Sequence, residues 1–125
     1  MTKKRAERIG MRVIGWCLNE YGCSKHYGEN APLLETQYQS DTNKRTYGEF
    51  DRDQVMIYVF TRTNRTVSCL VNTVIHEFRH YLQSPTWIGR YMTKYGEGRK
   101  NPYEREASDT ADADTDRCMK DLRLS

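Results

Sequence analysis

The segment Val74-Ile75-His76-Glu77-Phe78-Arg79-His80-Tyr81-Leu82 holds two of the three histidines of the chain, four residues apart, with a glutamate directly after the first. On a helix this spacing puts both imidazoles on one face, one turn apart. Two neutral imidazoles so placed can hold one Zn²⁺ at about 2.0–2.1 Å, and Glu77 can reach a water on the metal. The composition of the chain would produce this pattern in roughly one sequence in two hundred, so chance explains it poorly.

The residues around the two histidines divide into two faces when about 100° of rotation is taken for each residue. The face shared with the histidines carries small or ligand-capable side chains: Cys69, Asn72, Thr73, His76, His80 and Gln83. The opposite face is apolar and consists of Val67, Leu70, Val71, Val74, Phe78, Tyr81 and Leu82. One face should therefore pack on a core while the other forms a site. We predict a helix from about Thr66 to Gln83, stopped by Ser84-Pro85, that carries one zinc ion per chain.

The length and composition of the chain indicate a single domain over residues 1–125, since 37% hydrophobic residues support one modest core. A mean hydropathy of −0.91 with 30% charged residues is typical of a soluble protein. No run approaches the roughly 18 apolar residues of a membrane span, and the basic start at residues 3–5 lacks the apolar core of a signal peptide. We therefore expect no membrane partner and a cytoplasmic location, with a phage-encoded or packaged protein as a further possibility.

Cysteine spacing and charge distribution are less informative than the histidine motif. Cys17, Cys23, Cys69 and Cys118 form no C-x-x-C pair, so reduced cysteines with a packing role are expected. The net charge is only +3, with basic residues gathered at 3–12 and acidic residues at 109–116. A basic arm can bind nucleic acid, but such runs are usually solvated ends, so nucleic-acid binding is the less favoured interpretation.

The segments before the histidine helix predict an α+β fold. A helix over residues 3–20 is indicated by apolar residues at three- and four-residue steps, with Gly22 placed to end it. Three strands are expected at Leu33–Gln39, Thr46–Phe50 and Val55–Phe60, arranged as a small meander. The last strand is apolar without alternation and should be buried on both faces, whereas the second contains a glycine and suits an edge.

Two further helices are expected after the histidine helix. Residues Thr86–Tyr95 can form a short helix, and the aromatic stripe Trp87, Tyr91 and Tyr95 on it is more typical of core packing than of substrate contact. The last helix begins at Asn101-Pro102 and runs toward Leu122, because Asn is a favoured cap and Pro is favoured at the first helical position.

A catalytic zinc site needs three protein ligands and one open position, so a third ligand must come from elsewhere in the chain. Glu104 and Glu106 lie at the start of the last helix. Glu104 shares a face with the small residues Ala107 and Ala111, which would let this helix approach the histidine helix, while Glu106 falls on the opposite face, toward water. Glu104 is therefore the preferred ligand. A purely capping role for Glu104 beside Asn101, and Glu106 as the ligand, are the alternatives.

His76-Glu77-Phe78-Arg79-His80 followed by Glu104-Arg105-Glu106-Ala107 resembles the gluzincin branch of zinc metallopeptidases, in which a later glutamate lies in an E-x-x-A-D/N context. In size the chain is similar to the minimal single-domain gluzincin-like peptidases of bacteria and phages, and the match spans residues 47–108. The resemblance implies a zincin-like fold with an N-terminal helix, a small three-stranded sheet, the HExxH helix and a C-terminal helix with the third ligand. Ser108 departs from the pattern, because an Asp or Asn there usually orients a zinc histidine; Asp109 or Asn72 would have to do so instead.

The same resemblance implies hydrolysis of peptide bonds in a peptide or protein substrate. Zinc on His76, His80 and Glu104 would activate a water, with Glu77 as general base and as donor of the proton to the leaving amine. A second oxyanion donor is usual in such sites. Tyr95 is the preferred donor among the available side chains, which are Tyr95, Tyr91, Tyr81 and Arg79.

The second strand candidate is also expected to hold substrate. A sheet edge has unpaired backbone groups, so Tyr47–Phe50 would line the cleft beside the metal and bind an extended peptide through its main chain. The alternative is that this edge is solvated or covered by the loop Gly96–Lys100.

Two other functions compete with peptide hydrolysis. A non-catalytic zinc-stabilised module would use the metal to join the helices and would bind a partner through its surface, but it has no need of Glu77. A nucleic-acid-associated factor would act through the basic residues 3–12.

Overall fold

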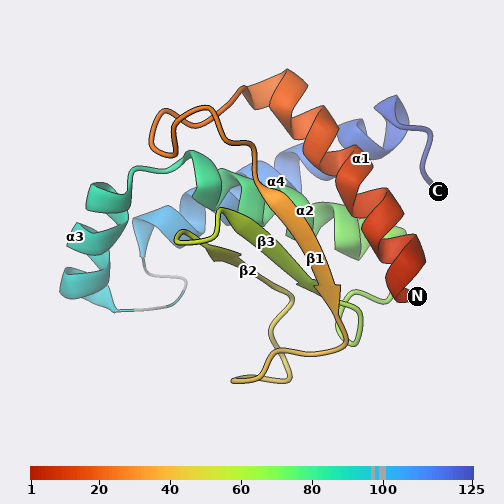
Figure 1. The fold of residues 1–125 in the computed structure, drawn as a ribbon, viewed down its shortest axis with the longest axis horizontal. Coiled ribbons are helices and arrows are strands. Elements are labelled where there is room, and N and C mark those ends of the chain that lie inside the picture. The colour runs from red at the N-terminus through yellow and green to blue at the C-terminus, as the bar shows by residue number, and fades with distance from the viewer. Residues whose placement is uncertain (97, 99–100) are drawn as a thin grey trace.

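A computed structural model describes residues 1–96, 98 and 101–125 (Figure 1). Within these residues the elements are α1 (Lys3–Tyr21), β1 (Leu33–Gln37), β2 (Gly48–Asp51), β3 (Met56–Phe60), α2 (Val67–Leu82), α3 (Pro85–Tyr95) and α4 (Pro102–Asp121). The predicted α+β class is confirmed, and each predicted helix and strand forms within a few residues of its expected bounds. No helix in this described part of the chain is both long and apolar enough to cross a membrane.

The strands form one mixed sheet with β3 in the middle, in the order β1-β3-β2. β1 runs parallel to β3, and β2 runs antiparallel to it with Gly48 opposite Val59. The predicted meander is therefore wrong. The turn between β2 and β3 is short, so these two strands are neighbours. The connection between β1 and β2, residues 38–47, is longer and lets β2 lie on the opposite side of β3 from β1. The central place goes to the most apolar strand, whose Ile57 and Val59 are 0% exposed, and β2 is an edge as predicted.

Helix α2 is the element around which the others pack, with α1, α4 and the sheet all in contact with it (Figure 1). Its apolar stripe is 0% exposed, as the periodicity predicted, and consists of Leu70, Val71, Val74, Phe78 and Tyr81. Burial of each side chain of this size contributes about 1.5–3 kcal/mol to folding. Because the stripe is fixed in the core, the face that carries the histidines must point away from it.

Side-chain caps define where the two helices that carry the predicted site begin. Thr66 caps α2, since its hydroxyl accepts a hydrogen bond from the Cys69 N–H at 3.1 Å. Asn101 caps α4, since its side-chain oxygen accepts from the Tyr103 N–H at 3.2 Å, and Pro102 occupies the first turn. Both starts agree with the sequence prediction.

Helix α3 contributes little to the core. Of its residues, all of which the structure describes, only Ile88 is buried. The aromatic rings contact one another instead: Trp87 and Tyr91 meet edge to face with ring centroids 5.5 Å apart, and Tyr91 and Tyr95 stack with centroids 5.9 Å apart. Tyr95 is 48% exposed. The expected core packing of the stripe is therefore wrong, because α3 meets the body of the protein along one narrow row only.

The C-terminal end of α4 is fastened to α1. The Tyr21 hydroxyl donates to Asp114 at 2.5 Å, and the Trp16 indole N–H donates to Asp121 at 2.9 Å. The acidic run at residues 109–116 is therefore only partly a solvated end. All four cysteines are free, and two of them, Cys17 and Cys118, are buried in this core.

Candidate metal centre

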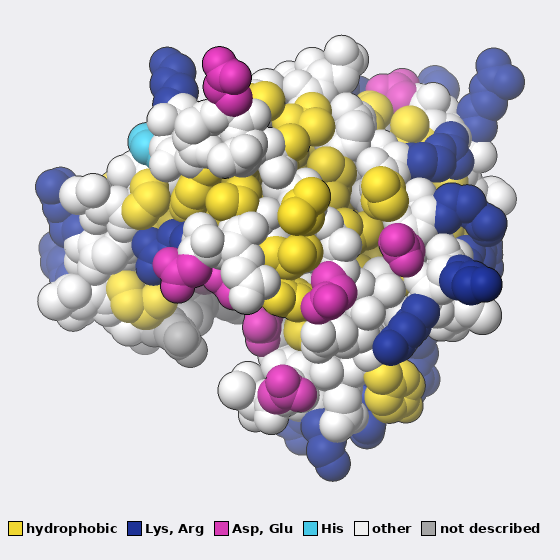
Figure 2. Space-filling view, in the orientation of Figure 1, with side chains coloured by type: hydrophobic (Ala, Val, Ile, Leu, Met, Phe, Trp, Pro, Cys, Tyr) yellow, Lys and Arg dark blue, Asp and Glu magenta, His cyan; other side chains and the backbone are white. Residues whose placement is uncertain are grey.

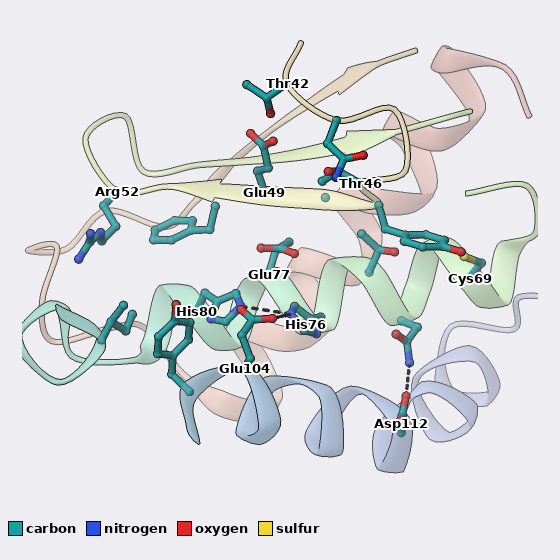
Figure 3. Close-up of a pocket in the computed structure, with 18 of the residues that line it drawn as sticks. Thr42, Thr46, Glu49, Arg52, Cys69, His76, Glu77, His80, Glu104 and Asp112 are labelled. Carbon is teal, nitrogen blue, oxygen red and sulfur yellow. Dashed lines mark hydrogen bonds and ion pairs between the residues drawn. The ribbon is translucent and has the colours of Figure 1, made fainter. Parts of the chain in front are cut away.

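His76, His80 and Glu104 meet at one point between α2 and α4 (Figure 3). The Nε2 atoms of the two histidines are 3.1 Å apart. Glu104 Oε1 lies 2.7 Å from His80 Nε2, and Glu104 Oε2 lies 3.5 Å from His76 Nε2. One ligand atom from each residue lies within 4.8 Å of the other two. The structure thus brings together the three residues that the sequence predicted as ligands.

The approach of α4 to α2 explains how Glu104 reaches the histidines. Ala107 and Ala111 are 0% exposed on the face of α4 that meets α2, so no larger side chain separates the helix axes. The Asn101 N–H donates to the Gly98 carbonyl at 3.0 Å, so Glu104 does not complete a capping box. The carboxylate is left to face His76 and His80, as the helix-face argument predicted.

The donor set fits a zinc ion. Two imidazole nitrogens and one carboxylate are the ligands of one established class of catalytic zinc site. Two nitrogens bound at about 2.0–2.1 Å in a tetrahedral arrangement are about 3.3 Å apart, close to the observed 3.1 Å. Both rings turn the same nitrogen, Nε2, toward the common point, as two ligands of one ion must.

The orientation of the His80 ring is fixed by a chain of hydrogen bonds on its far side. His80 Nδ1 lies 2.8 Å from Gln83 Oε1. Gln83 Nε2 donates to the Tyr103 carbonyl at 2.9 Å and also to Glu106 Oε2. Because both of those partners can only accept, the amide oxygen of Gln83 must face His80 and accept its Nδ1–H. This bond leaves the Nε2 lone pair of neutral His80 for a metal.

Glu106 does not face water as predicted. Its carboxylate accepts hydrogen bonds from Arg79 Nε at 2.8 Å and from Gln83, and it is half-buried. The helical wheel placed Glu106 opposite Glu104 correctly, but the last turn of α2 extends over that side of α4. Glu106 is therefore engaged in supporting the histidine helix, and the structure favours Glu104 over it as the ligand.

His76 has weaker support than His80. Its Nδ1 lies 3.4 Å from Ser108 Oγ, at the long end of hydrogen-bond distances. Neither residue proposed as a substitute orients the ring: Asn72 donates to Asp112 at 3.0 Å, and Asp109 is exposed. Ser108, which replaces the Asp or Asn expected from the resemblance, therefore gives the His76 ring a long and weak contact.

The charges of the cluster are strongly coupled. Burial alone would lower the pKa of His80, but hydrogen bonding to Glu104 and the nearby carboxylates raise it to about 9. Burial acts to raise the pKa of Glu104, yet its hydrogen bonds to His76 and His80 hold it well below its usual range. Without a metal, the cluster therefore holds a proton between Glu104 and His80.

Glu77 occupies the space between the cluster and strand β2, as Figure 3 shows. Its side chain is only 7% exposed, and burial raises the pKa of its carboxyl above the ordinary value. Gly48 of β2 makes room for it, because a Cβ on Gly48 would lie 3.1 Å from Glu77 Cγ and 2.7 Å from Thr73 Cγ2. The glycine in the edge strand thus permits close packing of β2 over the glutamate.

An open cleft of about 1090 Å³ contains the cluster. His76, Glu77, His80 and Glu104 all line it, and so does Tyr47–Phe50, as predicted for the sheet edge. Whether the loop Gly96–Lys100 covers this edge concerns residues 97, 99 and 100, which lie outside the described residues.

The structure does not bring Tyr95 to this cleft, and neither Tyr91, Tyr81 nor Arg79 is among the residues that line it. Tyr95 stacks on Tyr91 at the surface of α3. Two other tyrosines, Tyr47 and Tyr103, line the cleft. The Tyr103 ring centroid lies 5.7 Å from that of His80, and the place of Tyr103 directly before Glu104 is the signal that could have identified it.

No known protein-family model, curated protein sequence or solved structure matches this chain.

Proposed function

We propose that this protein is a zinc-dependent peptidase with a zincin-like fold of the gluzincin type. The observation that carries the proposal is that His76, His80 and Glu104 converge on one point while Glu77 lines the same cleft. A site that used zinc only to hold helices together would have four protein ligands and no adjacent carboxylate in an open cleft. The three ligands and the access to solvent favour catalysis.

The proposed mechanism assigns separate tasks to the residues of the cleft. His76, His80 and Glu104 would hold Zn²⁺, which when bound supplies Lewis-acid activation of water and of a peptide carbonyl. Glu77 accepts the proton of the attacking water at its carboxylate and returns it to the leaving amine. Burial raises the pKa of this carboxyl above its ordinary value, which makes the carboxylate a stronger base than that of an exposed glutamate.

Substrate would be held along strand β2. In the described sheet β2 pairs with β3 on one side only, so its other edge offers unpaired backbone groups to an extended peptide. Gly48–Phe50 lines the cleft that contains Glu77. A peptide added to this edge would therefore pass directly over the proposed general base.

The test is hydrolysis of a mixed peptide library by zinc-reconstituted protein, read by mass spectrometry. Wild-type protein should cleave, and Glu77→Gln should retain zinc but lose about 10²–10⁴-fold in turnover, because the amide cannot accept the proton. Glu35→Gln on the opposite edge strand β1 is the matched control and should behave as wild type. Equal turnover by Glu77→Gln would contradict the mechanism. Bound zinc with no cleavage by any variant would instead favour the non-catalytic binding module.

A further inference from the structure

A second hollow lies beside the cleft, between the connection that follows β1 and the segment that follows β3. It is lined by Lys44, Arg45, Tyr47, Arg62, Thr63 and Arg65. Four of these six residues are cationic and none is acidic. Figure 2 shows Lys and Arg side chains around the lower part of the molecule, with Asp or Glu side chains beside them, and Figure 1 shows that the connection between β1 and β2 lies there.

The four cations of this hollow have no carboxylate partner within the described part of the chain. Arg62 donates to the amide oxygen of Gln39 at 2.9 Å and lies over the ring of Tyr38. Arg65 Nε donates to the Arg62 carbonyl at 3.4 Å. By contrast, Arg79 and Arg117 each pair with an acidic side chain. Like charges gathered without counter-charges repel one another, so the hollow is poised to gain from an anionic ligand.

The hollow adjoins the candidate catalytic cleft at one residue. Tyr47 lines both. The backbone at this junction is held firmly, because the Tyr47 carbonyl accepts from Asn64 Nδ2 at 2.8 Å and from the Phe60 N–H at 3.1 Å. The hydroxyl of Thr63 also donates to the Thr46 carbonyl at 2.9 Å. A ligand that crosses from the cleft to the hollow therefore meets a fixed rim.

We propose that the hollow of Lys44, Arg45, Arg62 and Arg65 binds an acidic segment of the peptide substrate, next to the part that lies in the cleft. This inference rests on the proposed peptidase function and specifies its substrate class. A peptide extended along β2 would pass the end of that strand at Gly48 and reach Tyr47, which borders the hollow. Acidic side chains on that flank would then meet the four cations.

A peptide fits this pair of sites better than a nucleic acid does. The cleft itself is lined by the carboxylates Glu49, Glu77, Glu104 and Asp112, with Arg52 as its one Lys or Arg among those described. Even with Zn²⁺ bound, four carboxylates against Arg52 and the dication leave about one negative charge, so a phosphate backbone would lose the attraction of the four cations on passing from the hollow into the cleft. A peptide can carry negative charge at one end alone.

The test measures peptide binding by fluorescence anisotropy on zinc-loaded Glu77→Gln protein, which cannot turn over the probe. The probes are a fluorescein-labelled extended peptide with a run of glutamates at one end and the same peptide with glutamines there. The acidic probe should bind more tightly. Arg62→Gln/Arg65→Gln and, independently, Lys44→Gln/Arg45→Gln should each weaken its binding about two- to thirtyfold and reduce the preference over the neutral probe. All four residues are exposed, so the variants should fold.

The matched control is Lys25→Gln/Arg90→Gln, which removes the same charge at exposed positions that line neither cavity. It should bind both probes as the parent does. Equal weakening by the control, or equal binding of the two probes, would overturn the inference. Tighter binding of a single-stranded oligonucleotide that needs the same four cations would also overturn it, in favour of a nucleic-acid ligand.

The same measurements separate this inference from the proposed function. Charge-dependent probe binding without peptide hydrolysis by the wild-type protein would refute the peptidase proposal and leave an acidic-peptide site. Hydrolysis that shows no preference for acidic flanks, with all variants equal, would refute the present inference alone.

Discussion

The two ends of helix α4 both carry acidic residues that face another helix, yet they do different work. At the N-terminal end Glu104 meets two imidazoles of α2, and its partners are groups that bind metals. At the C-terminal end Asp114 accepts from Tyr21 of α1, whose hydroxyl is a donor without metal chemistry. The difference teaches that the chemistry of a carboxylate is set by what faces it. One end of α4 presents a carboxylate to groups that bind metals, and the other fastens the fold.

The largest effect on zinc affinity should come from a substitution at the N-terminal end of α4. Glu104→Ala removes one of three proposed ligands, so zinc affinity should fall by more than about a hundredfold, beyond the usual cost of losing an outer partner. The matched change Asp114→Ala at the other end should leave zinc affinity unchanged. Competition with a fluorescent chelator measures both. Equal losses in the two variants would mean that the ends of α4 do not differ in this way.

The pH dependence of zinc binding should also be large. Without metal, His80 has a pKa of about 9. Burial alone would lower this pKa from 6.5, but the hydrogen bond to Glu104 and the nearby carboxylates raise it. A metal needs neutral His80, so binding must displace that proton below about pH 9. Apparent affinity should therefore rise about tenfold per pH unit well below this pKa, and about fiftyfold from pH 7 to 9. Calorimetry in buffers of different ionisation enthalpy should detect one released proton at pH 7.5; no release there would contradict the assigned charge state.

An intermediate effect should follow from removing the support behind His80. Gln83→Ala deletes the acceptor of the His80 Nδ1–H, so zinc affinity should drop about 10–100-fold, as is usual for such partners. Gln37→Ala, on the edge strand β1, is the control for the substitution itself, since Gln37 makes only an exposed hydrogen bond to Glu35. A Gln83→Ala protein that binds zinc like the wild type would show that the ring is oriented by packing alone.

The smallest effect belongs to the C-terminal end. Tyr21→Phe removes the hydroxyl that donates a hydrogen bond to Asp114. It should lower the free energy of unfolding by about 1 kcal/mol and leave zinc affinity unaltered. Tyr58→Phe loses only an exposed hydrogen bond to Gln54 and should change stability less. Urea denaturation compares the two. A change in zinc affinity on Tyr21→Phe would show that the two ends of α4 are coupled.

Much of the site could be predicted because it depends on local geometry. Residues four apart on a helix share a face whatever the rest of the fold does, which placed His76 and His80 together. Asn101-Pro102 set where α4 begins, and the face that Glu104 shares with the small residues Ala107 and Ala111 indicated that Glu104 points inward. Caps and periodicity act within a few residues, so the sequence contains all that is needed to infer them.

The errors concern contacts between distant parts of the chain. The sheet order depends on which strand is stabilised most by having a neighbour on each side. The strand sequences indicated β3, but the assumed meander placed β2 in the middle. Glu106 was assigned to solvent because a helical wheel gives the direction of a side chain but not the residues that lie in that direction. Arg79 and Gln83 of α2 lie there. Tyr95 was the preferred oxyanion donor, but only the packing of α3 decides where its ring points.

The central claim is that His76, His80 and Glu104 form a metal site, and the metal content of the purified protein tests it most directly. Wild-type protein reconstituted with zinc and freed of excess ion should contain one zinc per chain by elemental analysis, and His80→Ala should contain almost none. His26→Ala, which removes the one histidine outside the cluster, should keep full stoichiometry. Absence of zinc from the reconstituted wild type, or equal zinc in wild type and His80→Ala, would contradict the account.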